Sequence, residues 1–199
     1  MSIARLFSAA LTAAALLLSP LGNEAQAQAY EAHLPADLAT NPDLCALVPC
    51  AEVFPGAQSF SQRMGQPPYV EAYGDADPQQ PGKKALLGYV MLSTDITDTP
   101  AYSGKPVVTL IGMDARGRYV GVKVLKHSEP ILLLGIPEST LVNFNNQYLG
   151  KSVTDQIEVG PSRPDENILG LDAISGATVT VIAQNQVMQL SGSAVARQV

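Results

Sequence analysis

The stretch from Val107 to Lys126, VVTLIGMDARGRYVGVKVLK, contains two strand-like segments that flank a turn. Residues 107–113 form a nearly continuous apolar run, and residues 119–126 place valines at alternate positions. Both patterns are typical of β-strands, and the segment between them includes Gly117, which suits a hairpin turn. Because a parallel pair needs a crossover of about a dozen residues or more, this short connection predicts an antiparallel sheet.

The segments that flank the hairpin predict one more strand and two helices. Residues 86–94 indicate a strand that is covered on both faces, because apolar side chains occupy both alternating sets of positions. After Pro137, helical spacing of apolar residues continues up to Gly150. Residues 179–195 form a second helical pattern, with these positions expected on one side: Val181, Ile182, Asn185, Met188 and Val195.

Two shorter apolar segments lie between the predicted helices. Residues 157–159 and 168–171 are separated by a turn-rich segment, so we expect a further hairpin or two edge strands. The fold class predicted from all of these elements is α+β, with an antiparallel β-sheet and helices packed on it.

Residues 1–29 have the pattern of a secretory signal peptide. Arg5 precedes an apolar run from Leu6 to Leu18, and two small-x-small cleavage motifs end at Ala27 and Ala29. The alternative is a membrane anchor, but the run is shorter than the roughly 20 residues of a transmembrane helix. We therefore expect the chain to be exported and this segment to be removed.

Residues 30–82 are rich in Pro, Gln and Ala and predict an irregular N-terminal arm, which precedes a core domain in residues 83–199. Cys45 and Cys50 are the only cysteines. In an exported protein, two neighbouring thiols favour a disulfide that closes a small loop. Two thiols alone do not make a metal site, so no metal is expected here.

The overall charge disfavours several classes of partner. The net charge is -6 and the pI is about 4.8, and Lys and Arg are not clustered. Nucleic acids and anionic membranes are therefore not expected partners, since both are recognised by clustered cations. A hydrolase is also disfavoured, because no Ser-His-Asp arrangement can be argued from the sequence.

The segment most informative about chemistry is DAISGAT, from Asp172 to Thr178, at the start of the last predicted helix. A hydroxyl in that position lies among backbone N–H groups that lack intrahelical partners, where a phosphate binds well. Taken alone, these residues are more typical of an ordinary helix cap. Thr178 has no His or Lys base beside it in sequence, so it is expected to be modified by another enzyme.

In this context DAISGAT resembles the attachment motif of FMN-binding domains, a family that includes periplasmic subunits of membrane redox pumps. That motif has Asp, two further residues, Ser or Thr, Gly, Ala, and finally Thr or Ser. The resemblance implies that a flavin transferase esterifies the Thr178 hydroxyl with the phosphate of FMN. It also implies that the other motif residues lie beside the phosphate or are recognised during attachment: Asp172, Ser175, Gly176 and Ala177.

A second segment, KHSEPILLLGIPE from Lys126 to Glu138, resembles the same family. His127 and Glu129 match the family's strand-to-loop region. The residues that follow depart from the Gly-rich form of the redox-pump subunits and are closer to members that serve nitrous oxide respiration. The resemblance implies that His127 and Glu129 lie near the flavin, whereas in isolation the pair is typical of a surface turn.

The resemblance therefore implies a periplasmic domain that relays electrons through covalent FMN. Its expected partners are a flavin transferase and the redox partners of a membrane electron-transfer system, nitrous oxide reductase among them. The alternative is a non-redox regulatory or assembly module of the same fold. Complete members of this branch continue into transmembrane helices and Cys-rich clusters, so we expect either the N-terminal portion of such a protein or a shorter relative.

Overall fold

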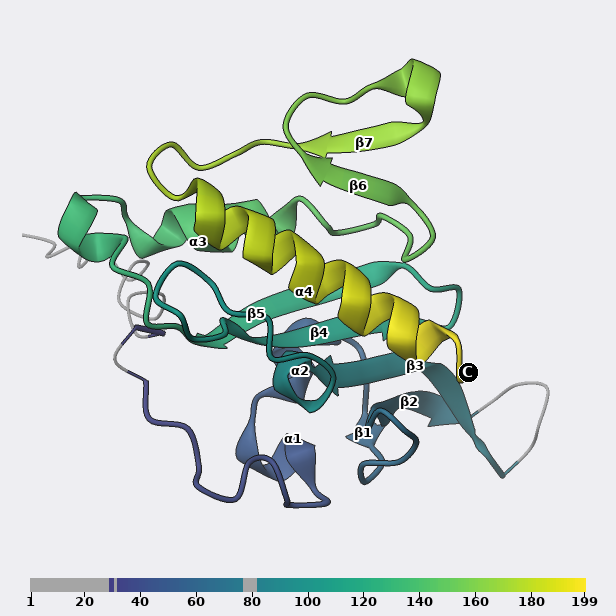
Figure 1. Cartoon of the computed structure of the whole chain (residues 1–199). Helices are drawn as coiled ribbons and strands as arrows, with labels where there is room; N and C mark the ends of the chain where they lie inside the picture. Colours follow the sequence, from purple (N-terminus) through teal and green to yellow (C-terminus); the bar gives the residue numbers. More distant parts are fainter. Residues whose placement is uncertain (1–28, 31, 77–81) are drawn as a thin grey trace, which may run out of the picture.

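The computed structural model describes residues 29–30, 32–76 and 82–199. The expected signal peptide lies outside this part of the chain, apart from Ala29. Figure 1 shows the elements, which follow in the order α1 (Leu44–Leu47), α2 (Cys50–Val53), β1 (Ser59–Phe60), β2 (Val70–Ala76), β3 (Lys84–Leu92), η1 (Ser93–Asp95), β4 (Val108–Asp114), β5 (Tyr119–Lys126), η2 (Leu132–Leu134), α3 (Glu138–Asn146), β6 (Gln156–Val159), η3 (Pro164–Glu166), β7 (Ile168–Leu171) and α4 (Thr178–Ala196). Strands β1 to β5 form one sheet in that order, and β6 pairs with β7.

The five-stranded sheet has helices on both faces (Figure 1). α3 and α4 cover one face, and the short helices α1 and α2 pack against the other. In β3, Tyr89 and Met91 belong to the core beneath α4, whereas Val90 and Leu92 belong to the core beneath α1 and α2. The predicted strand with two covered faces is therefore confirmed, and so is the α+β fold class.

The predicted hairpin of β4 and β5 is confirmed, and every pairing in the five-stranded sheet is antiparallel. Gly112 lies opposite Gly121 in this hairpin. A Cβ atom would lie 2.2 Å from the Val53 carbonyl oxygen at Gly112 and 2.1 Å from it at Gly121. Only glycine at both positions lets the end of α2 lie directly on the sheet.

The expectation of an irregular arm in residues 30–82 is wrong, because this segment contains α1, α2, β1 and β2. β2 pairs with β3, which crosses the position near residue 83 where the composition places a domain boundary. Val70 and Ala72 of β2 are buried, but the surrounding Pro and Gln residues hide this alternation in the sequence. The predicted disulfide between Cys45 and Cys50 is confirmed and joins α1 to α2.

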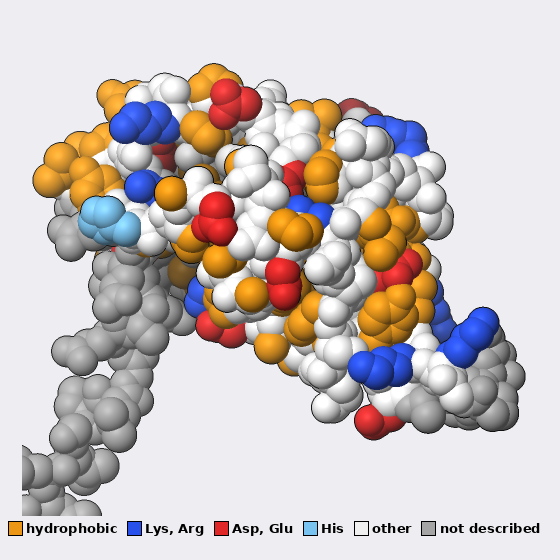
Figure 2. Space-filling model, turned by 90° about the horizontal axis from the view of Figure 1, so that it is seen from below, with side chains coloured by type: hydrophobic (Ala, Val, Ile, Leu, Met, Phe, Trp, Pro, Cys, Tyr) orange, Lys and Arg blue, Asp and Glu red, His pale blue; other side chains and the backbone are white. Residues whose placement is uncertain are grey.

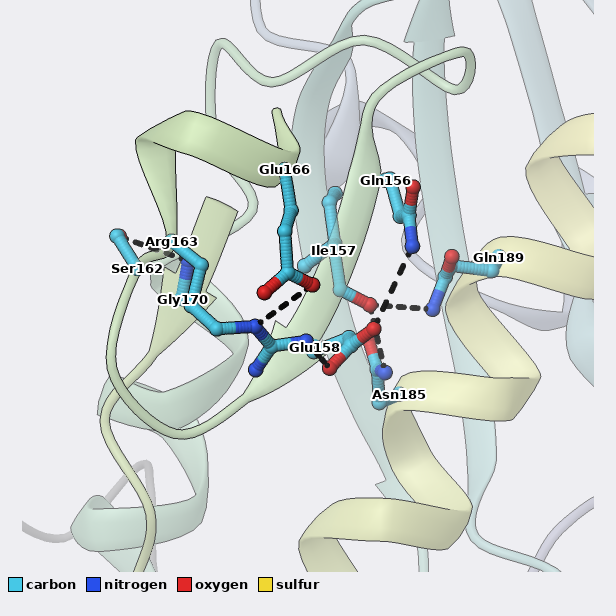
Figure 3. A network of polar contacts seen from close by, with 9 residues as sticks. All are labelled: Gln156, Ile157, Glu158, Ser162, Arg163, Glu166, Gly170, Asn185 and Gln189. Atoms are coloured by element: carbon cyan, nitrogen blue, oxygen red, sulfur yellow. Dashed lines mark hydrogen bonds and ion pairs between the residues drawn. The ribbon is translucent and has the colours of Figure 1, made fainter. Parts of the chain in front are cut away.

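The segments expected to form a hairpin or two edge strands are β6 and β7, and they pair in parallel. The connection between them contains η3, and Arg163 in that connection pairs with Glu158 and Glu166 (Figure 3). β6 is also held to α4, because the Ile157 carbonyl oxygen accepts hydrogen bonds from the side-chain amides of Asn185 and Gln189. The hairpin alternative is therefore wrong, because the two strands of a hairpin are antiparallel. The connection that contains η3 brings the chain back to the starting end of β6 before β7 begins, and this allows parallel pairing.

The two long helices are fixed by their buried faces. In α3, Leu141, Phe144 and Asn145 are buried. α4 crosses Tyr119 closely, because the Tyr119 hydroxyl donates to the Met188 carbonyl oxygen at 2.8 Å and a Cβ at Gly192 would lie 2.4 Å from that hydroxyl. Within the residues that the structure describes, no helix is both long and apolar enough to cross a membrane.

Candidate cofactor site at the start of the last helix

The segment from Asp172 to Ala177 is a turn that fixes where α4 begins. Gln147 holds the backbone of Asp172 from both sides, since it accepts from the Asp172 N–H at 2.7 Å and donates to its carbonyl oxygen at 3.2 Å. The Ala177 N–H donates to the carbonyl oxygen of Ile174 at 3.0 Å, and both side chains are buried in the core. Gly176 has a φ of 81°, a left-handed conformation that favours glycine.

The N-terminus of α4 has no side-chain cap. Ala177 occupies the N-cap position, where Ser, Thr, Asp or Asn would usually accept a hydrogen bond from the first turn. The backbone N–H groups of Thr178, Val179 and Thr180 have no hydrogen-bond partner among the described residues. The Thr178 side chain is exposed at the same place. Backbone N–H groups at the positive end of a helix, beside an accessible hydroxyl, have an arrangement in which an anion can bind.

A cavity of about 290 Å³ opens beside this helix start. Apart from the helix itself, its walls come from the turn at residue 102 and the loop at residues 130–134. Its lining residues are Tyr102, Pro130, Ile131, Leu134, Gly176, Ala177, Thr178, Val179 and Thr180. The cavity is thus mainly apolar, with hydroxyl and N–H groups gathered at the helix end, which is the usual composition of a cofactor site.

Glu129 hydrogen-bonds to two of the segments that surround the cavity. Its side chain has 0% exposure, and its two oxygens accept hydrogen bonds from the backbone N–H groups of Tyr102, at 3.1 Å, and Ser103, at 2.9 Å. The Thr180 hydroxyl donates to the same carboxylate. One buried side chain therefore connects the turn at residue 102, the end of β5 and the first turn of α4.

His127 is also buried and contacts Glu129. Its Nδ1 accepts from the Glu129 N–H at 3.2 Å, and its Nε2 faces Glu138 Oε1 at 3.6 Å. Burial lowers the pKa of His127, and the neighbouring carboxylates of Glu138 and Glu129 only partly oppose this shift. The same Glu138 oxygen accepts from the Ala29 N–H at 2.8 Å. His127 thus forms part of a buried contact with the N-terminal segment.

The structure brings four of the predicted site residues together at the start of α4: Ser175, Gly176, Ala177 and Thr178. The Asp172 side chain is exposed at the first position of this turn. Neither His127 nor Glu129 is among the residues that line the cavity. Their place beside the flavin stays a prediction, and Glu129 contacts the cavity lining through the Thr180 hydroxyl and the Tyr102 N–H.

Sequence reasoning missed three residues that shape this region. Tyr102 lines the cavity from a turn that carries no recognised ligand-binding motif. Thr180 is only two positions after Thr178, but its burial cannot be predicted from helical spacing of apolar residues. Glu138 is an acidic residue in the first turn of a helix, which is usually a solvent-exposed position favoured by the helix dipole, and here it is buried.

Known proteins resemble this chain in the same region. A family model described as FMN-binding domain matches residues 102–191. The chain is 42% identical over 111 residues to Regulatory protein NosR of Stutzerimonas stutzeri, which covers 56% of this chain and 15% of that protein. It is 37% identical over 147 residues to Regulatory protein NosR of Pseudomonas aeruginosa, covering 73% of this chain and 19% of that protein.

A third relative is Protein NirI of Paracoccus denitrificans, which is 30% identical over 95 residues, or 48% of this chain and 13% of that protein. This chain spans less than a fifth of the length of each of these three relatives. The matched region begins at Tyr102, which lines the cavity, and contains the whole DAISGAT segment.

Proposed function

We propose, since residues 102–191 of this chain belong to the FMN-binding domain family, that the chain carries FMN through a phosphoester on the hydroxyl of Thr178. The observation that supports this most is the helix start itself. An exposed Thr178 hydroxyl stands beside three backbone N–H groups without partners in the described part of the chain. An ordinary cap would satisfy those groups with a side chain, whereas a phosphate ester would satisfy them with its oxygens.

The residues around the cavity fit the rest of the cofactor. Thr178, Val179 and Thr180 would hold the phosphate through their N–H groups, and the helix dipole would stabilise its negative charge. Tyr102, Ile131 and Leu134 provide apolar walls that would take a flat aromatic ring and exclude water from one side of it. FMN supplies the electron-transfer chemistry, and the protein supplies attachment, orientation and environment.

Attachment requires another enzyme. The Thr178 hydroxyl has no hydrogen bond to a base among the described residues, so nothing in that part of the chain activates it as a nucleophile. Asp172 and Ser175 have exposed side chains on the approach to Thr178. We expect a flavin transferase to recognise them and to transfer FMN from a flavin dinucleotide. The Thr178 oxygen would form the new bond to the FMN phosphorus, the bond from that phosphorus to the bridging pyrophosphate oxygen would break, and the nucleoside monophosphate would leave while a base of the transferase takes the hydroxyl proton.

The domain would work in the periplasm, after removal of the signal peptide, and would relay electrons in a membrane-associated system that supports nitrous oxide respiration. Nitrous oxide reductase is the expected terminal partner. This part of the proposal is supported by the similarity to NosR proteins and by the apolar run and cleavage motifs in residues 1–29. A covalent cofactor suits such a place, because it cannot be lost by dissociation into a dilute compartment.

The test is mass spectrometry of the protein co-expressed with a flavin transferase. The intact protein should gain the mass of FMN less one water, located on the peptide that contains Thr178. Thr178→Val should carry no covalent flavin and keep an unchanged circular dichroism spectrum, because the side chain is exposed. Thr178→Ser keeps the hydroxyl and should retain attachment. Undiminished covalent flavin in the valine variant would show that the assignment is wrong.

A second function is suggested by the names of the relatives, two of which are called regulatory proteins. In that case the same fold would act as a regulatory or assembly module without electron transfer. The valine variant separates the two functions when electron transfer and nitrous oxide reduction are measured in cells that produce it. Loss of electron transfer supports the redox role, whereas unchanged nitrous oxide reduction without covalent flavin would favour the regulatory role.

A further inference from the structure

A second hollow lies beside the cofactor cavity and is lined by cations. It has a volume of about 720 Å³, and its lining residues are Tyr30, Ala32, His33, Lys105, Lys126 and Ser128. None of these described lining residues is acidic. The ammonium groups of Lys105 and Lys126 make no ion pair or hydrogen bond with any described residue. Lys123, by contrast, is paired with Glu52.

The hollow and the cofactor cavity share their dividing wall. The tight turn from Ala101 to Lys105, closed by a hydrogen bond between the Ala101 N–H and the Lys105 carbonyl oxygen, contributes Tyr102 to the cavity and Lys105 to the hollow. On the other side of the wall, Ser128 lines the hollow and Pro130 lines the cavity. Glu129 lies between these two residues and holds the turn in place.

Large apolar side chains are exposed along the same end of the molecule. Tyr102 is 66% exposed, Leu133 is 81% exposed and Leu134 is 63% exposed. Figure 2 shows hydrophobic side chains gathered with Lys or Arg and His side chains at one end of the face that it presents. Tyr102 and Leu134 line the cavity and Leu133 precedes Leu134 in the chain, so the exposed apolar side chains lie at the cavity, next to the turn that contributes Lys105 to the hollow.

We propose that this surface, formed by Tyr102, Leu133 and Leu134 together with Lys105, Lys126 and His33, is the docking site for a redox protein with an acidic face. This proposal rests on the proposed function, because docking here would bring the partner next to the bound flavin. The charge pattern decides the type of partner. Lysines that have no partner among the described residues, next to exposed apolar side chains, match a protein whose acidic side chains lie near its own redox centre.

The net charge of this chain makes the local pattern significant. At a net charge of -6, the whole molecule repels an acidic partner at long range. A local group of cations is therefore needed to direct an acidic protein to one end. The cations would also orient an acidic partner, because the negative net charge of the molecule disfavours its approach to other parts of the surface.

The first experiment follows oxidation of the reduced, FMN-loaded protein by ferricyanide, a trianion, in a stopped-flow instrument. Reduced FMN loses two electrons and releases its protons to solvent, and two ferricyanide ions each gain one electron. If the hollow attracts the oxidant, the rate falls as salt is added, because screening weakens the attraction. If only the net charge acts, the rate rises with salt, and that result would overturn the proposal.

Charge-reversal variants locate the effect. Lys105→Glu combined with Lys126→Glu should slow oxidation by ferricyanide roughly tenfold at low salt and should reverse the salt dependence. The control combines Arg116→Glu with Arg197→Glu, which changes the net charge equally at two exposed positions, one in the β4–β5 turn and one after α4. An equal decrease in both double variants would contradict docking at the hollow.

A second measurement needs no flavin and tests for an acidic polypeptide. Thr178→Val protein is titrated with poly-L-glutamate and, separately, with hexacyanocobaltate(III), and amide shifts are followed by NMR. Binding of poly-L-glutamate at residues 102–105 and 126–134 supports the proposal, and the lysine double variant should abolish it. Binding of hexacyanocobaltate(III) alone would indicate a small-anion site and overturn it. Because this protein carries no flavin, failure of the FMN assignment would leave the result interpretable.

Discussion

At the scale of single residues, Glu129 has the largest structural role in the site. It is fully buried, and three donors from two other segments point at its carboxylate. Glu129→Gln would place an NH₂ group against at least one of those donors. We expect the free energy of unfolding to fall by about 1–3 kcal/mol, the usual effect of leaving a buried donor without an acceptor. Chemical denaturation followed by circular dichroism measures this change.

The control for this variant is Ser139→Ala, an exposed position in α3. That change should leave the free energy of unfolding within about 0.5 kcal/mol of that of the starting protein. Hydrogen exchange gives a second reading of Glu129→Gln, since the amides of Tyr102 and Ser103 should exchange faster. If the amides of Tyr102 and Ser103 kept their protection in Glu129→Gln, the Glu129 carboxylate would not be the group that holds the turn at residues 101–105 in place.

At the scale of elements, the contact between α2 and the β4–β5 hairpin depends on two facing glycines. Gly121→Ala would place a Cβ atom 2.1 Å from the Val53 carbonyl oxygen, which is backbone and cannot rotate away. Overpacking of this kind usually costs about 1–3 kcal/mol. We expect a lower unfolding midpoint for Gly121→Ala than for Ala115→Gly in the exposed turn of the same hairpin. An unchanged midpoint for Gly121→Ala would show that α2 can move off the sheet without loss.

The same elements show what the sequence could and could not predict. The hairpin, β3 and both long helices follow from local apolar periods, and all are present. In α4 the expected apolar side was only partly right, because Ile182 is exposed while Gln184 and Ser191 are buried. Gln184 is satisfied inside the core by Thr109 and Asn145. The spacing of apolar residues cannot predict a buried helix face that includes polar side chains, since those side chains are buried with hydrogen-bond partners far away in the sequence.

In the candidate site, too, the local segment could be predicted from the sequence and the long-range contacts could not. The DAISGAT segment predicts the helix start correctly, because the local sequence alone requires a turn there. The cavity depends on Tyr102, which lies more than 70 positions earlier in the chain. The pairing of Glu129 with Thr180 spans 51 positions. Contacts of this length are set by the tertiary fold, so no pattern within one segment could have supplied them.

At the scale of the whole molecule, both ends of the described chain are held to the domain. The backbone of Ala29 bonds to His127 and Glu138, and Gln198 accepts from the Gln66 N–H and donates to the Pro67 carbonyl oxygen. The N-terminal contact is the one that depends on protonation. The His127 imidazole in this contact is buried and faces the carboxylates of Glu138 and Glu129. Among the described residues it has no other charged neighbour.

The global stability should therefore decrease as the pH falls through the range in which an unfolded histidine titrates. Burial lowers the pKa of His127 below the ordinary value of 6.5. Below about pH 6.5 the unfolded chain binds a proton that the folded chain does not, so the free energy of unfolding decreases as the pH falls toward the lower folded pKa. The slope reaches at most about 1.4 kcal/mol per pH unit. His127→Gln should remove this slope, whereas His33→Gln, at an exposed position, should retain it. Denaturation midpoints measured between about pH 5 and 7.5 test both variants, and an equal slope in all three proteins would assign the acid sensitivity to other groups.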